Sequence, residues 1–284
     1  MTVEVLMSTY NGEKFIKEQV DSILNQTIHV HITVRDDGSK DSTVNILRGY
    51  EGVNVIEGQN KGSTESFLTL IELAPNADYY AFSDQDDVWD MDKLEIAIKA
   101  LEEYKNRPSV YSGNTRLVDG EVKFIKNETL NPVTTLGSAI TKNYATGCTV
   151  VFNSKLMDKL KMCHPVGIPF HDWWVNLVCL SVGGVSIYDV TPHMSYRQHS
   201  NNVVGGNDNA WKKWCSRLKK LRKPYHRERM AKEILENYEV GGQEKSILEA
   251  IASGNSKKIY NAGVGTGNKI DNILFYCCVV IKKI

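Results

Sequence analysis

Three aspartates, Asp84, Asp86 and Asp87, lie within four positions of one another, directly after the apolar run 79–82. Carboxylates this close repel one another, so a fold tolerates them at a strand end when a positive charge lies between them. A hard divalent cation, Mg²⁺ or Mn²⁺, with a phosphorylated substrate completing its coordination, commonly supplies that charge. The alternative is an acidic turn that caps the next helix. The cluster therefore predicts either a metal site or a helix cap.

The composition is that of an ordinary globular protein. The chain has 284 residues, of which 42% are hydrophobic and 24% charged, and its formal net charge is zero. Because a neutral chain has no global field that attracts nucleic acid, we expect no nucleic-acid partner. The six cysteines form no CxxC pair and no metal-ligand spacing, which is typical of reduced cytoplasmic thiols. We expect a cytoplasmic protein, at most peripheral on the inner face of the cell membrane, because no apolar stretch approaches roughly 20 residues.

The first 105 residues alternate between short apolar strands and amphipathic helices. Strands are predicted at 3–8, 28–35, 53–56 and 79–82. The alternation indicates an α/β fold with a central sheet covered by helices on both faces. Since such sheets bind ligands beyond the carboxyl ends of their strands, the informative segments are 9–11, 36–39, 60–62 and 84–86. The chain has no GxGxxG and no GxxxxGK[ST] motif, so neither a dinucleotide fingerprint nor a P-loop is predicted.

The second half of the chain is less regular. We expect strands at 110–112, 147–152 and 185–190, a hairpin at 117–122, and helices at 154–162 and 171–180. These pieces predict a mixed sheet edge beside the first half, followed by a mainly helical extension.

Five segments in order resemble motifs of the family 2 glycosyltransferases of the GT-A fold. They are STYNG at 8–12, DDGS at 36–39, SDQDDVW at 83–89, HDWW at 171–174 and YRQH at 196–199. Among these enzymes the chain looks most like the bacterial rhamnosyltransferases of capsule, O-antigen and cell-wall polysaccharide synthesis. The resemblance implies a GT-A domain over 1–205, with a nucleotide-sugar half (1–105) and an acceptor half (106–205), and a basic helical extension over 206–284.

The resemblance implies that the aspartates hold Mn²⁺ or Mg²⁺ on the donor diphosphate. We favour Asp86 as a direct ligand, with Asp84 acting on the metal, through water or on the ribose. Asp87 is interpreted equally well as structural. His199 is a candidate third ligand or phosphate contact, and the alternative is an ordinary loop histidine.

Asp172 is our candidate general base. It would accept the proton of the acceptor hydroxyl as that oxygen attacks the anomeric carbon opposite the leaving diphosphate, which inverts the anomeric configuration. The alternative is a helix N-cap, because Asp172 opens a predicted helix. The family usually has an acidic residue before this aspartate, whereas this chain has His171.

The donor site is predicted from the strand ends. Tyr10 could stack on a pyrimidine, and Asp36 or Asp37 could accept the N3–H of the base, which selects uracil or thymine. The alternative for these two aspartates is a simple turn. Lys61 could reach a phosphate and Arg197 could pair with the diphosphate, unless it forms an ordinary surface ion pair. The remaining donor-site candidates are Thr9, Asn11, Ser83 and Asp84.

Three tryptophans, Trp89, Trp173 and Trp174, could stack on acceptor sugar rings, and the alternative is aromatic core. In the extension, residues 211–232 contain ten Lys or Arg and one acidic residue, with aromatic and aliphatic side chains between them. This pattern is typical of peripheral contact with an anionic membrane, or of a solvated helix face packed on the domain.

We therefore expect an inverting, metal-dependent glycosyltransferase that transfers L-rhamnose from dTDP-rhamnose to a growing, lipid-linked bacterial surface polysaccharide. The alternatives are a UDP-hexose-dependent enzyme of the same fold and a nucleotidyltransferase. A nucleotidyltransferase would also use paired aspartates but would have a basic Gly-rich loop after the first strand. A third alternative is a non-catalytic sugar-binding scaffold, which the presence of Asp86, Asp172 and His199 disfavours.

Overall fold

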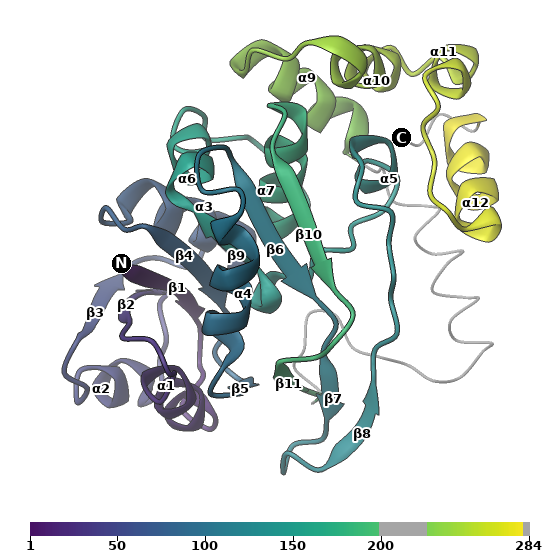
Figure 1. The fold of residues 1–284 in the computed structure, drawn as a ribbon. Coiled ribbons are helices and arrows are strands. Elements are labelled where there is room, and N and C mark those ends of the chain that lie inside the picture. Colours follow the sequence, from purple (N-terminus) through teal and green to yellow (C-terminus); the bar gives the residue numbers. More distant parts are fainter. Residues whose placement is uncertain (199–225, 281–284) are drawn as a thin grey trace.

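The computed structural model describes residues 1–198 and 226–280, and a seven-stranded sheet forms its centre (Figure 1). Across the sheet the strands are β10 (Val185–Asp189), β6 (Ser109–Gly113), β9 (Val151–Asn153), β4 (Tyr79–Ser83), β1 (Val3–Thr9), β2 (His31–Asp36) and β3 (Val53–Glu57). β9 is antiparallel to β4 and to β6, and the other neighbouring pairs are parallel. The predicted mixed α/β sheet is confirmed.

Both faces of the sheet are buried, because alternate side chains of its central strands enter two separate cores. Val5 and Met7 of β1 pack with α1 (Ile16–Leu24), α2 (Thr43–Leu47) and α4 (Lys93–Glu102). Leu6, on the opposite face, packs with α3 (Ser63–Leu73), α6 (Ser154–Leu160) and α7 (His171–Ser181). The two layers of helices fix the carboxyl ends of β1, β2 and β4 at one edge of the sheet.

A smaller sheet lies beside this edge and consists of β5 (Val88–Trp89), β11 (Met194–Arg197), β7 (Arg116–Val118) and β8 (Phe124–Asn127). The predicted hairpin is confirmed, since β7 and β8 are antiparallel and Asp119 accepts hydrogen bonds from the amides of Glu121 and Lys123 at 2.9 Å. β11 is antiparallel to β5, which directly follows residues 84–87. We call these residues the acidic loop. This pairing places Arg197 against that loop.

The strand predicted at 147–152 begins later in the structure. Gly147–Thr149 forms a 3₁₀ turn, and the strand itself is β9. The helix after it is capped by Asn153, whose side-chain oxygen accepts the amide of Leu156. Asn is among the best N-cap residues because its side chain satisfies an amide that has no partner inside the helix.

Four helices complete the described chain: α9 (Arg227–Asn237), α10 (Gly242–Ala252), α11 (Ser256–Asn261) and α12 (Lys269–Val280). Their buried side chains belong to the same core as those of α7 and of α5 (Leu136–Ala139). Residues 226–280 therefore pack on the domain. Residues 211–225 of the predicted membrane segment lie outside the described residues. None of the helices within the described ranges has both the length and the apolar character that crossing a bilayer requires.

Candidate active site

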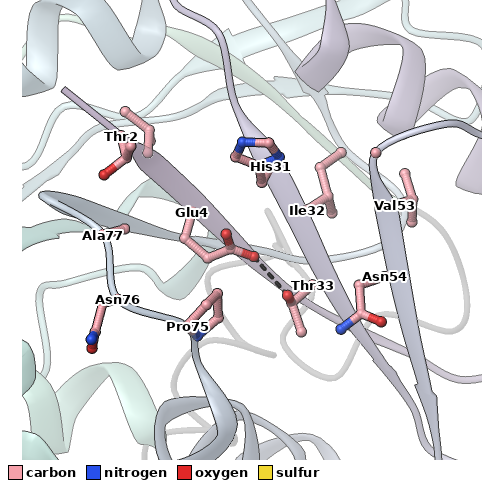
Figure 2. Close-up of a pocket in the computed structure, with 12 residues that line it drawn as sticks. Thr2, Glu4, His31, Ile32, Thr33, Val53, Asn54, Pro75, Asn76 and Ala77 are labelled. Carbon is pink, nitrogen blue, oxygen red and sulfur yellow. Dashed lines mark hydrogen bonds between the residues drawn. The ribbon is translucent and has the colours of Figure 1, made fainter.

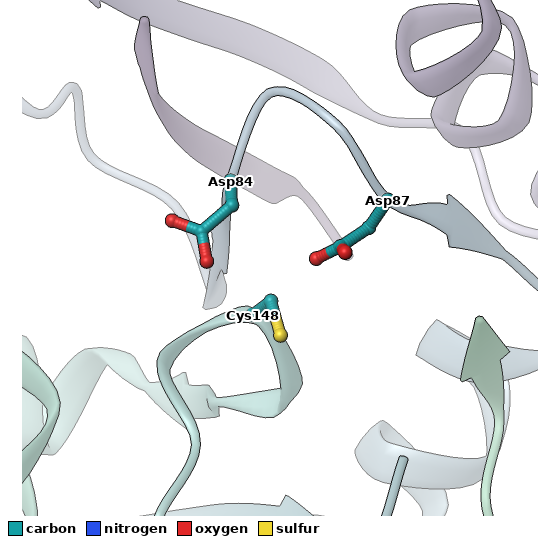
Figure 3. Close-up of side chains that lie close together, drawn as sticks. All are labelled: Asp84, Asp87 and Cys148. Carbon is teal, nitrogen blue, oxygen red and sulfur yellow. The ribbon is translucent and has the colours of Figure 1, made fainter. Parts of the chain in front are cut away.

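The acidic loop follows β4 at the carboxyl edge of the sheet. Asp84 and Asp86 are partly exposed, whereas Asp87 is fully buried. Figure 3 shows the carboxylates of Asp84 and Asp87 on either side of Cys148, and the nearest ligand atoms of these three residues lie within 4.8 Å of one another. Asp86 is outside this group, so its direct metal ligation stays a prediction. His199 lies outside the described residues.

Burial and mutual repulsion raise the pKa values of two carboxyl groups in this loop. Burial, and then the charges of Asp86 and Asp172, raise the pKa of Asp84 to about 7. Burial, with Asp86 and Asp84, also raises the pKa of Asp87 well above its usual range. A cation between these carboxylates would remove the repulsion. Asp84 and Asp86 suit a hard divalent ion by residue type, and their role as its ligands stays a prediction.

Behind the acidic loop lies a lysine of the chain itself, Lys93. Its side chain is buried, with Nζ 3.3 Å from the ring centroid of Trp89. Burial lowers its pKa to about 7, while Cys148 and Asp87 oppose the shift. Burial also raises the pKa of Cys148 well above its usual range, so the thiol keeps its proton and is a poor metal ligand. On the inner side of the loop, Lys93 and Asp87 therefore interact electrostatically, and the predicted metal ligands Asp84 and Asp86 lie on the partly exposed side.

Arg197 stabilises the loop, and its prediction as a diphosphate partner is wrong. Its side chain is only 2% exposed, because its guanidinium donates to the backbone carbonyls of Asp86 and Gly120 and to the carboxylate of Glu18. Its own amide donates to Asp87 at 3.2 Å. A guanidinium enclosed in this way has no accessible face for a phosphate, so Arg197 fixes the shape of the acidic loop.

Asp172 lies in the first turn of α7, beside the acidic loop, and is 9% exposed. Its Oδ1 accepts hydrogen bonds from Asn143 Nδ2 at 3.0 Å and from the amide of Trp173 at 2.6 Å. Burial raises the pKa of Asp172 to about 6, against the opposing effect of these two donors and of the amide of Gly147. The carboxylate therefore holds a proton more tightly than an ordinary aspartate does and is still largely ionised at neutral pH, as a general base requires.

The 3₁₀ turn at 147–149 joins the two halves of the site. A Cβ added to Gly147 would come within 3.4 Å of the side chains of both His171 and Asp172, and the next residue, Cys148, has its Sγ within 4.8 Å of the Asp84 and Asp87 carboxylates. His171 is stacked on Phe67 with ring centroids 3.8 Å apart, and burial lowers its pKa to about 3. The residue before Asp172 is therefore a buried, neutral imidazole ring. No sequence motif distinguishes Asn143, Gly147 or Cys148, because their contacts form only in the folded chain.

The predicted contact of Asp36 or Asp37 with the nucleobase is wrong. Asp36 accepts from Thr9 Oγ1, from the amides of Gly38 and Ser39 and from Ser39 Oγ. Asp37 pairs with Arg35 and accepts the amides of Lys61 and Gly62. A carboxylate has about four lone-pair sites, and in both residues the protein uses them. These aspartates, with buried Thr9, instead fix the loops after β1, β2 and β3.

The accessible donor-site candidates are Tyr10, Asn11, Lys61 and Asp84. Tyr10 is 44% exposed, and Gln85 fixes its backbone: Oε1 accepts the Tyr10 amide at 2.8 Å and Nε2 donates to its carbonyl at 3.1 Å. The sequence motifs predicted no role for Gln85. Its two hydrogen bonds hold the loop after β1 against the acidic loop. Ser83 is wrong as a donor contact, because it is fully buried and its hydroxyl donates to the carbonyl of Asp84.

The three tryptophans are core residues, so their assignment to an acceptor site is wrong. Trp89 is 3%, Trp173 4% and Trp174 1% exposed. Trp173 Nε1 donates to the carbonyl of Ala139 at 2.7 Å, and Trp174 packs near the ring of Tyr238. Indole rings this deeply buried offer no face to a sugar.

A separate hollow of about 570 Å³ lies at the amino ends of β1, β2 and β3 (Figure 2). Glu4 lies in it and accepts a 2.6 Å hydrogen bond from Thr33. None of the motif residues lines this hollow. The candidate active site lies at the carboxyl ends of the strands, and this hollow lies at their amino ends.

Sequence comparison now identifies the family. The glycosyl transferase family 2 profile matches residues 4–160, which include β1 to β9 and the acidic loop. The chain is a family 2 glycosyltransferase.

Two curated relatives of this glycosyltransferase are informative. It is 31% identical to the dTDP-rhamnosyl transferase RfbG of Shigella flexneri, over 80% of this chain and 82% of that protein. It is 28% identical to the UDP-Glc:alpha-D-GlcNAc-diphosphoundecaprenol beta-1,3-glucosyltransferase WfgD of Escherichia coli, over 65% of this chain and 72% of that protein.

Solved structures confirm the glycosyltransferase fold. Staphylococcus aureus TarS 1–349 has a TM-score of 0.60 at 18% identity, covering 92% of this chain and 71% of that one. The mannosyltransferase PcManGT of Pyrobaculum calidifontis, solved with GDP-Man and Mn²⁺, has a TM-score of 0.58 at 15% identity, covering 99% and 86%. The predicted GT-A fold is therefore confirmed.

Proposed function

We propose that this glycosyltransferase inverts the anomeric configuration of its donor sugar, with Asp172 as the general base. The observation that carries the proposal is the position of Asp172, whose charge is close enough to Asp84 to raise the pKa of that residue. Base and acidic loop therefore share one site. Base catalysis of this kind contributes roughly 10²- to 10⁴-fold.

The other residues orient the reacting groups. Asn143 Nδ2 and the amide of Trp173 hold one oxygen of Asp172, so the carboxylate keeps one orientation. The Asp172 side chain is largely buried, and the neighbouring His171 ring is stacked on Phe67. A fixed base in a partly dry site removes the acceptor proton without first reorganising its own surroundings.

We also propose that Asp84 and Asp86 hold Mg²⁺ or Mn²⁺ on the donor diphosphate. The support is the accumulation of carboxylate charge at Asp84. When bound, the ion stabilises the negative charge of the leaving diphosphate. Tyr10, Asn11 and Lys61 are the exposed side chains that would contact the nucleotide.

For the donor we propose dTDP-L-rhamnose, with a UDP-hexose as the alternative. The relative RfbG, named for dTDP-rhamnosyl transfer, supports the first, and WfgD, named for UDP-Glc, favours the second. The name of WfgD includes a diphosphoundecaprenol acceptor, which supports a saccharide or lipid-linked saccharide acceptor in bacterial surface polysaccharide synthesis.

The deciding experiment is Asp172→Asn, with Asp158→Asn on the exposed side of α6 as the matched control. The amide keeps the size of the side chain but removes the proton acceptor. We expect transfer to fall roughly 10²-fold or more while the calorimetric affinity for dTDP and UDP stays unchanged. Near-normal turnover of Asp172→Asn would reject the base assignment, and an equal loss of donor affinity would place Asp172 in the donor site.

The metal assignment has its own test. Sugar transfer should stop in EDTA and return when Mn²⁺ or Mg²⁺ is added. Asp84→Asn and Asp86→Asn should each weaken the binding of the donor in the presence of the metal. Full activity in chelator would reject it.

A further inference from the structure

The last described helix has an apolar face that no described residue covers. On α12, Ile270 is 60%, Ile273 63% and Val280 71% exposed, and Cys277 is also exposed. These positions are three, four and three residues apart, so they lie along one side of the helix. We call them the α12 apolar face. α12 lies at the outer edge of the molecule (Figure 1).

The opposite side of α12 is firmly attached, so the orientation of this face is fixed. Phe275 is 3% and Val279 2% exposed, within the same core as α7 and α10. The hydroxyl of Tyr276 donates to the carbonyl of Val264 at 2.7 Å. Single exposed aliphatic residues are normal, but a continuous stripe on an anchored helix marks an interaction site.

The charges around the face are positive. The exposed charged residues of α11 and α12 are Lys257, Lys258 and Lys269. The acidic residue of α12, Asp271, is paired with Lys142 at 3.0 Å. Residues 256–280 thus carry three lysines and one acidic residue in a chain that is neutral overall.

Tyr260 of α11 extends the face with an aromatic ring. It is 72% exposed, and its ring lies edge-on to that of Tyr276 at 6.0 Å between centroids. Aliphatic side chains with a tyrosine and lysines at the border are the composition of helices that lie in the interface of an anionic bilayer.

The positive charge around the α12 apolar face disfavours two other binding partners, a second copy of the chain and the chain's own segment 211–225. A second copy docked through the same face would bring lysines against lysines. The chain's own segment 211–225 is basic in sequence and would meet the same repulsion. We propose that the α12 apolar face, with Tyr260 and the adjacent lysines, binds the surface of an anionic membrane. This inference goes beyond the proposed transfer reaction and does not depend on the donor.

The test uses the full chain and vesicles, without sugar nucleotide, so that its outcome is separate from that of the proposed function. The variant is Ile270→Gln with Ile273→Gln, because Gln keeps helix propensity and removes the apolar contact. The control is Leu73→Gln with Val190→Gln, two residues that are each 54% exposed elsewhere on the surface. We expect wild type and control to co-sediment with phosphatidylglycerol vesicles more strongly than with pure phosphatidylcholine. The α12 variant should bind about tenfold more weakly, and salt should weaken binding of all three.

Thermal unfolding and light scattering complete the test. If lipid is the occupant, the α12 variant keeps the wild-type melting temperature and all proteins keep one oligomeric state. The proposal is overturned if the α12 variant binds vesicles as strongly as wild type does. It is also overturned if wild type binds phosphatidylglycerol and phosphatidylcholine vesicles equally. It is also overturned by a dimer that only the α12 variant loses, which identifies a second copy. A lower melting temperature with unchanged vesicle binding identifies the chain's own segment and overturns it too.

Discussion

Gly147→Ala tests whether the 3₁₀ turn fixes the position of the base. A Cβ at this position would lie 3.1 Å from Nε2 and 3.3 Å from Cε1 of His171, and 3.4 Å from Oδ2 of Asp172. Ordinary carbon contacts are about 3.5–4.0 Å, so a neighbour must move by a few tenths of an ångström. His171 is held between Phe67 at 3.8 Å and Phe82 at 5.0 Å. The movement therefore falls on the turn or on Asp172.

The size of the effect follows from this displacement. A misplacement of about 1 Å in a reacting group can cost about 10²-fold in rate, so a few tenths should cost roughly three- to tenfold in kcat. Overpacking of this size should lower the unfolding free energy by about 1 kcal/mol. Since Gly147 does not have a positive φ, alanine adds no backbone strain there. Donor affinity should stay unchanged, because the contact involves the base.

Gly137→Ala in α5 is the matched control. Its Cβ would meet Gly263 O at 3.4 Å and Val264 Cα at 3.7 Å, which are ordinary contacts. We expect full activity and a gain of up to about 1 kcal/mol in unfolding free energy, because alanine restricts the unfolded chain. The assays are steady-state transfer at saturating donor and acceptor, thermal unfolding and donor calorimetry. Wild-type kcat in a normally stable Gly147→Ala protein would refute the proposed contact between the turn and the base.

Three further predictions concern two residues of the site and one histidine outside it. Tyr10→Ala should raise the donor KM about three- to tenfold through the loss of ring stacking, with an unchanged melting temperature; an unchanged KM would exclude the stacking. Arg197→Met should lower the unfolding free energy by about 2–4 kcal/mol, measured by urea denaturation, because it leaves buried carbonyls without donors; a loss of activity at full stability would restore the phosphate role. Burial lowers the pKa of His164, but hydrogen bonds to Glu72 and Glu65 produce a net rise. The stability difference between wild type and His164→Gln, at most about 1 kcal/mol, should therefore be complete below the unfolded pKa of about 6.5 and decline as pH rises through the folded pKa. A difference that grows with pH would contradict this assignment.

The sequence predicted the frame of the site well, because that frame depends on local patterns. Alternating apolar residues indicated the strands, and strand ends indicated which polar residues share an edge. Asp84 was found in this way, whereas Asp172 came from the HDWW segment at the start of a predicted helix, and in the structure the charge of Asp172 helps to raise the pKa of Asp84. Their metal and base roles stay predictions.

The wrong assignments share one physical cause. A residue type shows what a side chain can bind, but not whether the folded chain already uses that capacity. Asp36, Asp37 and Arg197 are suitable in charge, yet backbone and side-chain partners occupy them. Trp173 is surrounded by residues from distant parts of the chain. Gln85 and Asn143 went unnoticed because their partners lie 75 and 29 residues away.

The position of Arg227 determines where the chain can be truncated or joined to a relative. Its guanidinium donates to the carbonyls of Ile140 and Thr141 and lies 5.4 Å from the ring centroids of both Trp173 and Phe275. A truncation after residue 205, or an exchange of the C-terminal helices between relatives, therefore removes the cation that packs against Trp173, the residue after Asp172. The C-terminal helices and α7 therefore share one core, and a chimaera must transplant Arg227 and Trp173 together.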